Sequence, residues 1–188
     1  MRIITGKAKG CKLQAPKGMQ TRPTTDRVKE SLFNILGDAV VDAVVLDIFA
    51  GSGALGLEAL SRGATRAVFI DSSRDSNTII SHNARHTRLE GQCTLLSSDV
   101  LIALTKLTVK RQLFDLVFCD PPYNQGFVSN VLAKLDAGGL LSPDCIIVIE
   151  HSRHEVPAPT WSHFLLRRSE RYGETLLSFF SGRKANEA

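Results

Sequence analysis

The stretch that decides the fold runs from residue 44 to residue 64 and reads VVLDIFAGSGALGLEALSRGA. Its first part, 44–49, is apolar apart from Asp47 and predicts a short buried strand. Glycines follow at three positions within 51–56, and the apolar pattern after them predicts a helix over 54–62. The glycine spacing formally matches the G-x-G-x-x-G pattern of dinucleotide sites, which is a weak signal by itself.

The same alternation of strand and helix continues toward the C-terminus. Continuous apolar strands separated by helices are typical of a parallel sheet that is covered on both faces. The C-terminal end differs, because HFLLRRSER and ETLLSFFSG flank Tyr172-Gly173 with no room for a helix, which predicts an antiparallel hairpin. Further strands are expected at 66–71, 93–99, 113–120 and 145–151, with helices at 25–36, 75–88, 100–107 and 125–136.

A mostly parallel sheet closed by an antiparallel hairpin is not the plain dinucleotide-binding fold. It predicts an α/β, Rossmann-like fold of the class I methyltransferases that use S-adenosylmethionine. Residues 2–14 predict a small N-terminal β-hairpin extension, and 15–24 a connector. We therefore expect an N-terminal hairpin and connector at 1–24, whose basic side chains would face RNA, and a methyltransferase domain at 25–188.

Composition and charge limit the function classes. Hydrophobic residues make up 43% of the chain and charged residues 22%, and the start of the chain does not resemble a signal peptide, so we expect a cytoplasmic protein. No feature of the sequence requires a partner chain, so we expect a monomer. The four cysteines form no C-x-x-C pair, and no metal site is expected. Residues 1–30 hold eight Lys and Arg against two acids, which is +6, so the other residues sum to −2. This asymmetry favours contact with a polyanion such as RNA.

Acidic side chains stand at the predicted carboxyl ends of three strands, where ligands bind in open α/β sheets. Asp47 precedes the glycines, Asp71 ends the second strand, and Asp99 ends the third. A carboxylate beside phosphates would be unfavourable, whereas Asp47 could bind the ammonium of a methionine group whose carboxylate lies at the helix start. Asp71 could accept ribose hydroxyls, and Asp99 an adenine amino group. The alternative is that each carboxylate caps the loop or helix that follows it.

The fourth strand ends in Asp120-Pro121-Pro122-Tyr123. The lone pair of an exocyclic base amine is conjugated into the ring and is a poor nucleophile. Two acceptors, the Asp120 carboxylate and the Pro121 carbonyl, would favour a pyramidal nitrogen whose lone pair points at a methyl donor. The prolines stiffen the backbone, and Tyr123 could stack on the base. Cys119 should point to the other face, so no covalent intermediate is expected.

Five segments together resemble the RsmD family, over essentially the whole chain: MRIITGKAKGCKL, TRPTTDRVKESLFNIL, VLDIFAGSGALGLEALSRGA, FDLVFCDPPY and RYGETLLSFF. The resemblance implies methyl transfer from S-adenosylmethionine to N2 of one guanine of 16S ribosomal RNA, within the assembling small ribosomal subunit. The implied cofactor-binding residues are Asp47, Phe49, Gly51, Gly53, Asp71, Ser72, Asp99 and Val100. The implied catalytic residues are Asp120, Pro121, Pro122 and Tyr123, and the implied RNA contacts are Arg2, Lys7, Lys9, Arg22, Thr24 and Arg27.

One departure from the family is Asp71, where many members have glutamate. Three other functions stay open: adenine-N6 methylation of DNA or RNA with the same motif, an NAD-dependent oxidoreductase, and a non-catalytic RNA-binding assembly module. The pair Glu150-His151 at the end of the fifth strand is interpreted as structural.

Overall fold

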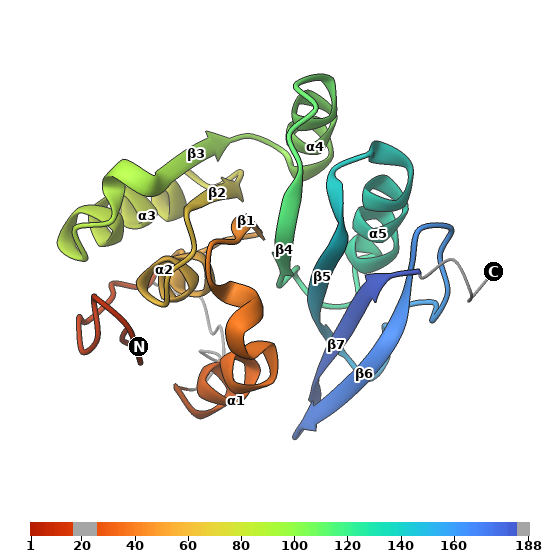
Figure 1. The fold of residues 1–188 in the computed structure, drawn as a ribbon, viewed down its shortest axis with the longest axis horizontal. Helices are drawn as coiled ribbons and strands as arrows, with labels where there is room; N and C mark the ends of the chain where they lie inside the picture. The colour runs from red at the N-terminus through yellow and green to blue at the C-terminus, as the bar shows by residue number, and fades with distance from the viewer. Residues whose placement is uncertain (17–25, 184–188) are drawn as a thin grey trace.

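The computed structural model of the protein describes residues 1–16 and 26–183. Within these residues seven strands form one sheet in the order β3-β2-β1-β4-β5-β7-β6 (Figure 1). Strands β3, β2, β1, β4 and β5 are parallel, whereas β7 pairs antiparallel with both β5 and β6. The strands are β1 (Val44–Ile48), β2 (Arg66–Asp71), β3 (Cys93–Ser97), β4 (Phe114–Cys119), β5 (Leu141–Ser152), β6 (Phe164–Tyr172) and β7 (Thr175–Gly182).

Helices cover both faces of the sheet, and the sheet divides the core into two clusters. Helices α1 (Asp26–Leu36), α2 (Ala54–Ser61) and α3 (Arg74–His86) contribute to one cluster. Helices α4 (Val100–Val109) and α5 (Phe127–Gly138) contribute to the other. Short 3-10 turns, η1 (Gly37–Val40) and η2 (Glu90–Gln92), lead into β1 and β3. None of the helices in the described part of the chain is long and apolar enough to cross a membrane.

The predicted fold class is confirmed, including the antiparallel C-terminal hairpin. The largest difference is at β5, which begins at Leu141 rather than at residue 145. Leu141 pairs with Phe114, and the register shifts between Phe114 and Leu116 before regular pairing resumes. Residues 141–144 include polar and exposed residues, and the register is irregular here. This part of β5 therefore lacks the continuous apolar sequence by which a buried parallel strand is predicted.

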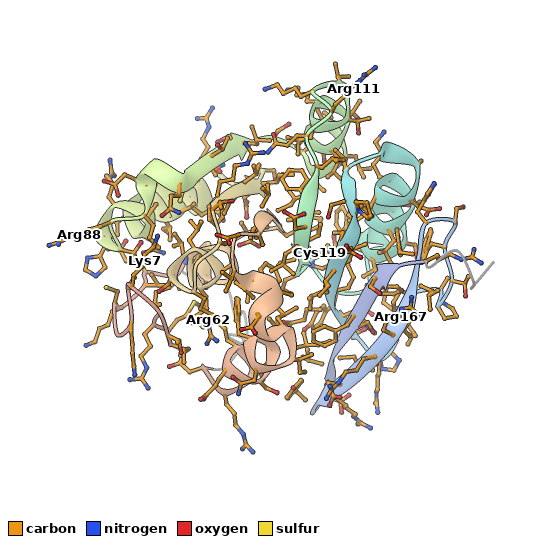
Figure 2. All side chains as sticks on the ribbon, viewed as in Figure 1. Lys7, Arg62, Arg88, Arg111, Cys119 and Arg167 are labelled. Atoms are coloured by element: carbon orange, nitrogen blue, oxygen red, sulfur yellow. The ribbon has the colours of Figure 1, made fainter. Side chains whose placement is uncertain are left out.

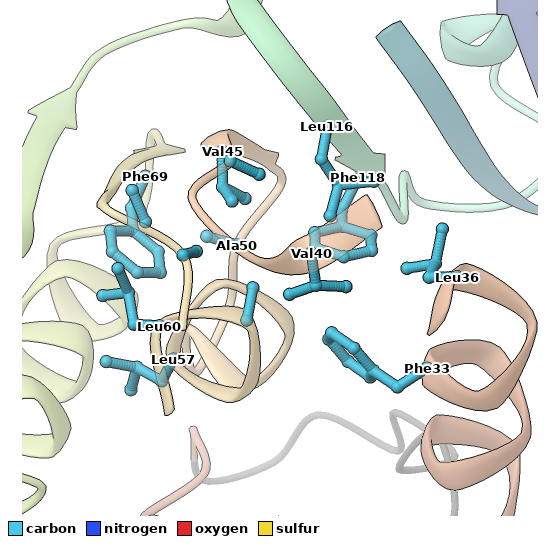
Figure 3. Close-up of a cluster of buried hydrophobic side chains, with 14 of the residues drawn as sticks. Phe33, Leu36, Val40, Val45, Ala50, Leu57, Leu60, Phe69, Leu116 and Phe118 are labelled. Carbon is cyan, nitrogen blue, oxygen red and sulfur yellow. The ribbon is translucent and has the colours of Figure 1, made fainter. Parts of the chain in front are cut away.

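The core on the α1–α3 face positions the ends of the central strands. Successive strand residues point to opposite faces, so Phe69 and Phe118 pack on this side with residues of α1 and α2 (Figure 3). The rings of Phe33 on α1 and Phe118 on β4 lie 5.7 Å apart between centroids. Burying a side chain of this size stabilises the fold by about 1.5–3 kcal/mol. Helix α1 is therefore fixed directly on the strand that leads to Asp120.

The N-terminal segment, residues 1–16, packs into the same core. Ile3, Ala8 and Leu13 are buried there, with exposed fractions of 8% or less. The predicted hairpin is present as a single antiparallel bridge between Arg2 and Lys12 rather than as two regular strands. Its turn docks on the end of α2, where the Lys7 N–H donates to the Ser61 carbonyl at 2.9 Å.

A buried ion network lies beneath this segment. Lys29 Nζ of α1 lies 3.1 Å from Glu58 Oε2 of α2, and the side chains are 1% and 0% exposed. Arg62 Nε donates to Glu58 Oε1 at 2.8 Å, and the guanidinium lies 4.7 Å from the centre of the Phe33 ring. Burial lowers the pKa of Lys29, and the neighbouring Glu58 carboxylate opposes that shift.

The network also holds the backbone of the N-terminal segment. Glu58 accepts the N–H groups of Ile4 at 2.8 Å and Thr5 at 3.0 Å, and Lys29 donates to the Arg2 carbonyl at 2.5 Å. Lys29 is therefore neutralised inside the protein, although its charge was counted in the N-terminal excess of basic residues. A charge count along the sequence cannot distinguish a buried lysine from an exposed one.

Gly6 is the position at which this docking is most sensitive to a side chain. Its φ is +87°, and an added Cβ would lie 1.8 Å from the Ser61 carbonyl oxygen. We expect Gly6→Ala to release the turn from α2 and to lower the free energy of unfolding by about 1–3 kcal/mol beyond the left-handed strain itself. Denaturant unfolding measures the loss.

Gly10 supplies the matched control for that experiment. Its φ is +86°, and an added Cβ would meet no atom within 4 Å in residues 1–16 and 26–183, its chain neighbours aside. Gly10→Ala therefore carries the same backbone strain without the clash. Equal losses of stability in the two variants would contradict a close-packed turn at Gly6.

Candidate functional site

The carboxyl ends of the five parallel strands meet along one edge of the sheet, as expected for an open α/β fold. Ile48 of β1 pairs with Ile70 of β2 and with Cys119 of β4, and Cys119 pairs with Ile149 of β5. The residues that follow, Phe49, Asp71, Asp120 and Glu150, consequently lie at one level.

Four carboxyl groups face the same side of the sheet. Phe118 and Val148 belong to the core cluster on the α1–α3 face, and strand alternation places Asp120 and Glu150 two residues later on that face. Asp47 and Asp71 follow Val45 and Phe69 of the same cluster by the same interval. Cys119 lies on the opposite face in the other cluster, as predicted, and Figure 2 places it in the interior.

Asp47 is buried beneath the glycine loop, residues 51–53. Its side chain is 3% exposed, and its Oδ2 accepts the Gly56 N–H at 2.9 Å. Burial raises the pKa of this carboxyl to about 7, while the Gly56 hydrogen bond acts in the opposite direction and Asp71 adds to the rise. A buried carboxyl of this kind is stabilised by a cation brought next to it.

The glycine loop leaves room for a ligand at its first residue. Gly51 and Gly53 have φ values of +56° and +75°. Among the described residues not adjacent to Gly51 in the chain, the only atom within 4 Å of a Cβ added there is the Phe49 carbonyl oxygen at 3.9 Å. A Cβ at Gly56 would lie 2.4 Å from the Phe69 ring, so this third glycine is required by helix–strand packing. The loop, the start of α2 and Asp47 together fit a group that carries both a carboxylate and an ammonium.

Asp71 and Asp99 both accept hydrogen bonds from backbone N–H groups. Asp71 accepts the Gly51 N–H at 2.8 Å through Oδ2 and the Ser73 N–H at 2.8 Å through Oδ1. Asp99 caps α4, because its Oδ1 accepts from Leu101 and Ile102. A carboxylate has about four acceptor positions, so each acid retains capacity for hydroxyl or amino groups of a ligand. Ser72 is exposed beside Asp71, and Val100 is buried after Asp99.

The Asp120–Tyr123 motif leaves β4 and crosses to β5. Pro121 is buried, Pro122 is exposed, and Tyr123 is 38% exposed. The Tyr123 hydroxyl donates to Glu150 Oε1 at 2.8 Å and lies 3.1 Å from Thr175 Oγ1, so the ring is held at its far end. Burial raises the pKa of the partly exposed Asp120 well above its ordinary value, and the nearby carboxylates of Glu150 and Asp47 add to the rise.

Sequence reasoning did not assign Glu150 and Thr175 to the site. Glu150 is 9% exposed and influences both Asp120 and Tyr123. Its position at the end of a parallel strand was the available signal, but the pair Glu150-His151 was interpreted as structural. That interpretation fits His151 alone, which is fully buried and whose ring nitrogens contact the Ser152 carbonyl and the Ser178 hydroxyl. Phe49 is a further neighbour of the motif's loop, with its ring 5.1 Å from that of Phe127.

The predicted RNA contacts are distributed over the N-terminal segment and α1. Lys9 and Arg27 are exposed, and Lys7 Nζ donates to Gln92 Oε1 at 2.6 Å on the protein surface. Arg2 is exposed and pairs with Asp26 at 3.2 Å. Arg22 and Thr24 lie outside the described residues.

A cavity of about 470 Å³ lies away from these groups. It is lined by the end of α5, the start of β5 and the ends of the C-terminal hairpin, including Asp136 and His163. It contains none of the strand-end acids, so it does not belong to the candidate site.

The sheet order and its antiparallel closing strands define the class of protein, a class I S-adenosylmethionine-dependent methyltransferase. The family model described as "Conserved hypothetical protein 95" matches residues 1–181. The chain belongs to this family, the RsmD family.

Relatives and solved structures agree with that assignment. "Ribosomal RNA small subunit methyltransferase D" of Escherichia coli K12 is 41% identical over 80% of this chain and 74% of its own length. "Putative rRNA methyltransferase YlbH" of Bacillus subtilis is 36% identical over 97% of this chain and 100% of its own length. The solved structure of "Putative methyltransferase yhhF from Escherichia coli" is similar with a TM-score of 0.84 and 35% identity, and the match covers 97% of this chain and 98% of that one.

Proposed function

We propose that the protein transfers a methyl group from S-adenosylmethionine to the exocyclic N2 of one guanine in 16S ribosomal RNA of the small ribosomal subunit. The observation that carries the proposal is the line of Asp47, Asp71, Asp120 and Glu150 on one face at the carboxyl edge of the sheet. The printed names of the relatives support a ribosomal RNA substrate. The choice of guanine N2 rests on the family resemblance, and a cytoplasmic monomer is part of the same proposal.

The cofactor would lie along the first half of the edge. Asp47 and the glycine loop would hold its methionine part, with the Phe49 backbone alongside, Asp71 and Ser72 would hold the ribose, and Asp99 and Val100 the adenine. When bound, it supplies an electrophilic methyl group on a sulfonium. Asp71 already accepts from the Gly51 N–H, so the same carboxylate that would bind ribose also orients the glycine loop.

The acceptor base would lie at the second half of the edge. The Asp120 carboxylate and the Pro121 carbonyl accept the two N–H groups of the amine, which directs the nitrogen lone pair toward the methyl group. Once the nitrogen carried the methyl group, its surplus proton would leave to an Asp120 carboxylate oxygen or to water. The raised pKa of Asp120 makes that carboxylate a better proton acceptor than an ordinary aspartate. Tyr123, held by Glu150 and Thr175, presents a ring of fixed position on which the base can stack.

The pKa of Asp47 predicts how cofactor affinity depends on pH. Below the pKa of about 7 the carboxyl is protonated and cannot pair with an ammonium. We therefore expect the affinity for S-adenosylhomocysteine to fall as pH drops below that value, approaching tenfold per pH unit, and to level off above it. Calorimetry across this range measures the change.

Asp47→Asn is the control for this pH dependence. The asparagine keeps an oxygen for the Gly56 N–H but does not ionise. We expect weaker binding without the acid-side decline. An unchanged affinity of the wild-type protein between about pH 6 and about pH 8 would exclude Asp47 as the partner of the ammonium.

Methyl transfer from labelled S-adenosylmethionine tests the proposed function directly. Three substrates are compared: small ribosomal subunits that lack the modification, naked 16S RNA, and DNA. The product is then digested to nucleosides. N2-methylguanosine from the subunits is the expected result. Label only in N6-methyladenine would retain the chemistry of the motif and overturn the substrate, and RNA binding without any transfer would favour a non-catalytic assembly module.

A further inference from the structure

Asn83 on α3 joins two parts of the protein that lie far apart in the sequence. It is fully buried. Its Nδ2 donates to the Ser52 carbonyl in the glycine loop at 2.9 Å and to the Gln14 carbonyl at 3.0 Å. Its Oδ1 accepts the Gln14 N–H at 2.9 Å. One side-chain amide therefore bonds the N–H and the carbonyl of Gln14 and also the carbonyl of Ser52, in the loop expected to hold the cofactor.

The identity of this residue is not explained by helix formation or by packing. Asparagine is a weak helix former, and burying its amide is unfavourable unless both ends are hydrogen-bonded. Here both the NH2 donor and the carbonyl acceptor of Asn83 are hydrogen-bonded. Together they bond the Gln14 backbone as the main chain of a neighbouring β-strand would. An apolar residue would fill the position in α3 without linking the segment to the loop.

The N-terminal segment also contacts the other end of α2. The Ala8 N–H donates to Ser61 Oγ at 2.9 Å, and Ser61 Oγ donates to the Thr5 carbonyl at 2.6 Å. The segment therefore contacts α2 at its last residue, Ser61. Through Asn83 it also contacts Ser52, which lies just before the first turn of α2. A displacement of the segment would change the position of the loop, because both contacts act on one short rigid helix.

We propose that Asn83 is a positioning residue that couples docking of residues 1–14 to cofactor binding at the glycine loop. The inference rests on the proposed function, since it takes the loop as the site of the methionine part. The segment carries the basic side chains expected to contact RNA, so RNA bound there would tighten cofactor binding, and the cofactor would tighten RNA binding by the same factor. Asn83 acts on the reaction only through the backbone of Ser52 and Gln14.

The test uses S-adenosylhomocysteine as the probe and needs no RNA. Asn83→Ala is expected to raise its Kd by roughly 5- to 150-fold, the usual range of a coupling between two sites. In the wild-type protein, saturating probe should slow hydrogen exchange of the backbone amides in residues 2–14. In Asn83→Ala at saturating probe, that slowing should disappear. Thr87→Val is the control, because Thr87 is also buried and, within the part of the chain that the structure describes, its hydroxyl donates only to carbonyls at the end of α3.

Gly6→Ala tests the same coupling from the opposite end, in case Asn83→Ala does not fold. It disturbs the contact with Ser61 without substituting any residue of α3 or of the glycine loop. Its Kd for the probe should also rise, whereas Gly10→Ala should bind as the wild-type protein does. Tight binding that neither Asn83→Ala nor Gly6→Ala weakens would overturn the coupling alone. Failure of the wild-type protein to bind the probe would overturn the proposed function together with it.

Discussion

Replacing Asp120 by alanine is expected to reduce kcat for methyl transfer by about 100- to 1,000-fold, the loss typical of a removed group that stabilises developing charge. The variant loses one of the two acceptors that orient the amine. Cofactor affinity should stay the same, because Asp47, Asp71 and the glycine loop are untouched. The measurement is turnover with labelled S-adenosylmethionine on small ribosomal subunits, together with calorimetry of S-adenosylhomocysteine.

Two further variants sharpen this result. Asp120→Asn keeps one acceptor oxygen in place and should retain part of the activity. Asp144→Ala removes an exposed carboxylate from the first part of β5, at the opposite end of the strand from Glu150, and should have no effect on kcat. A near-normal rate for Asp120→Ala would remove this motif from the chemistry.

The largest effect on stability is expected from Glu58→Gln. The change leaves Lys29 buried without its counter-charge and places an amide donor next to other donors, among them the Ile4 and Thr5 N–H groups. Breaking a buried ion pair by removing one partner costs about 3–5 kcal/mol. Urea denaturation should show this loss, and hydrogen exchange should show that the amides of residues 2–5 have lost protection.

Glu30→Gln is the matched control, because Glu30 is an exposed acid on α1, next to Lys29. Its effect should stay within about 0.5 kcal/mol. The double variant Lys29→Met with Glu58→Leu removes both charges and should recover part of the loss, while residues 2–5 stay unprotected. Equal stabilities of Glu58→Gln and Glu30→Gln would show that the network does not hold the N-terminal segment.

The sequence predicted the repeated elements because each is encoded locally. The signals are apolar runs of strand length, leucines at helical spacing, and glycines at turns, and each acts within a few residues. Together they were enough to predict the parallel sheet and its closing hairpin. The strand-end positions of Asp47, Asp71 and Asp120 followed from the same local patterns, since the carboxyl ends of parallel strands share one edge. Their roles toward cofactor and base stay predictions.

Contacts between distant segments were not predictable in this way. Glu150 and Thr175 reach Tyr123 across 27 and 52 residues, and Asn83 reaches Gln14 across 69. Lys29 looked like one more surface charge until the fold placed it against Glu58.

By itself, the sequence determined the fold class, the glycine loop and which acids end the strands. The tertiary structure decided which of those acids face one another, how Tyr123 is held and how the N-terminal segment is tied to the loop. The physical reason is the range of the interactions. Periodicity and turn chemistry depend on neighbours along the chain, whereas burial of a charge and pairing of a buried amide depend on what the fold brings beside them.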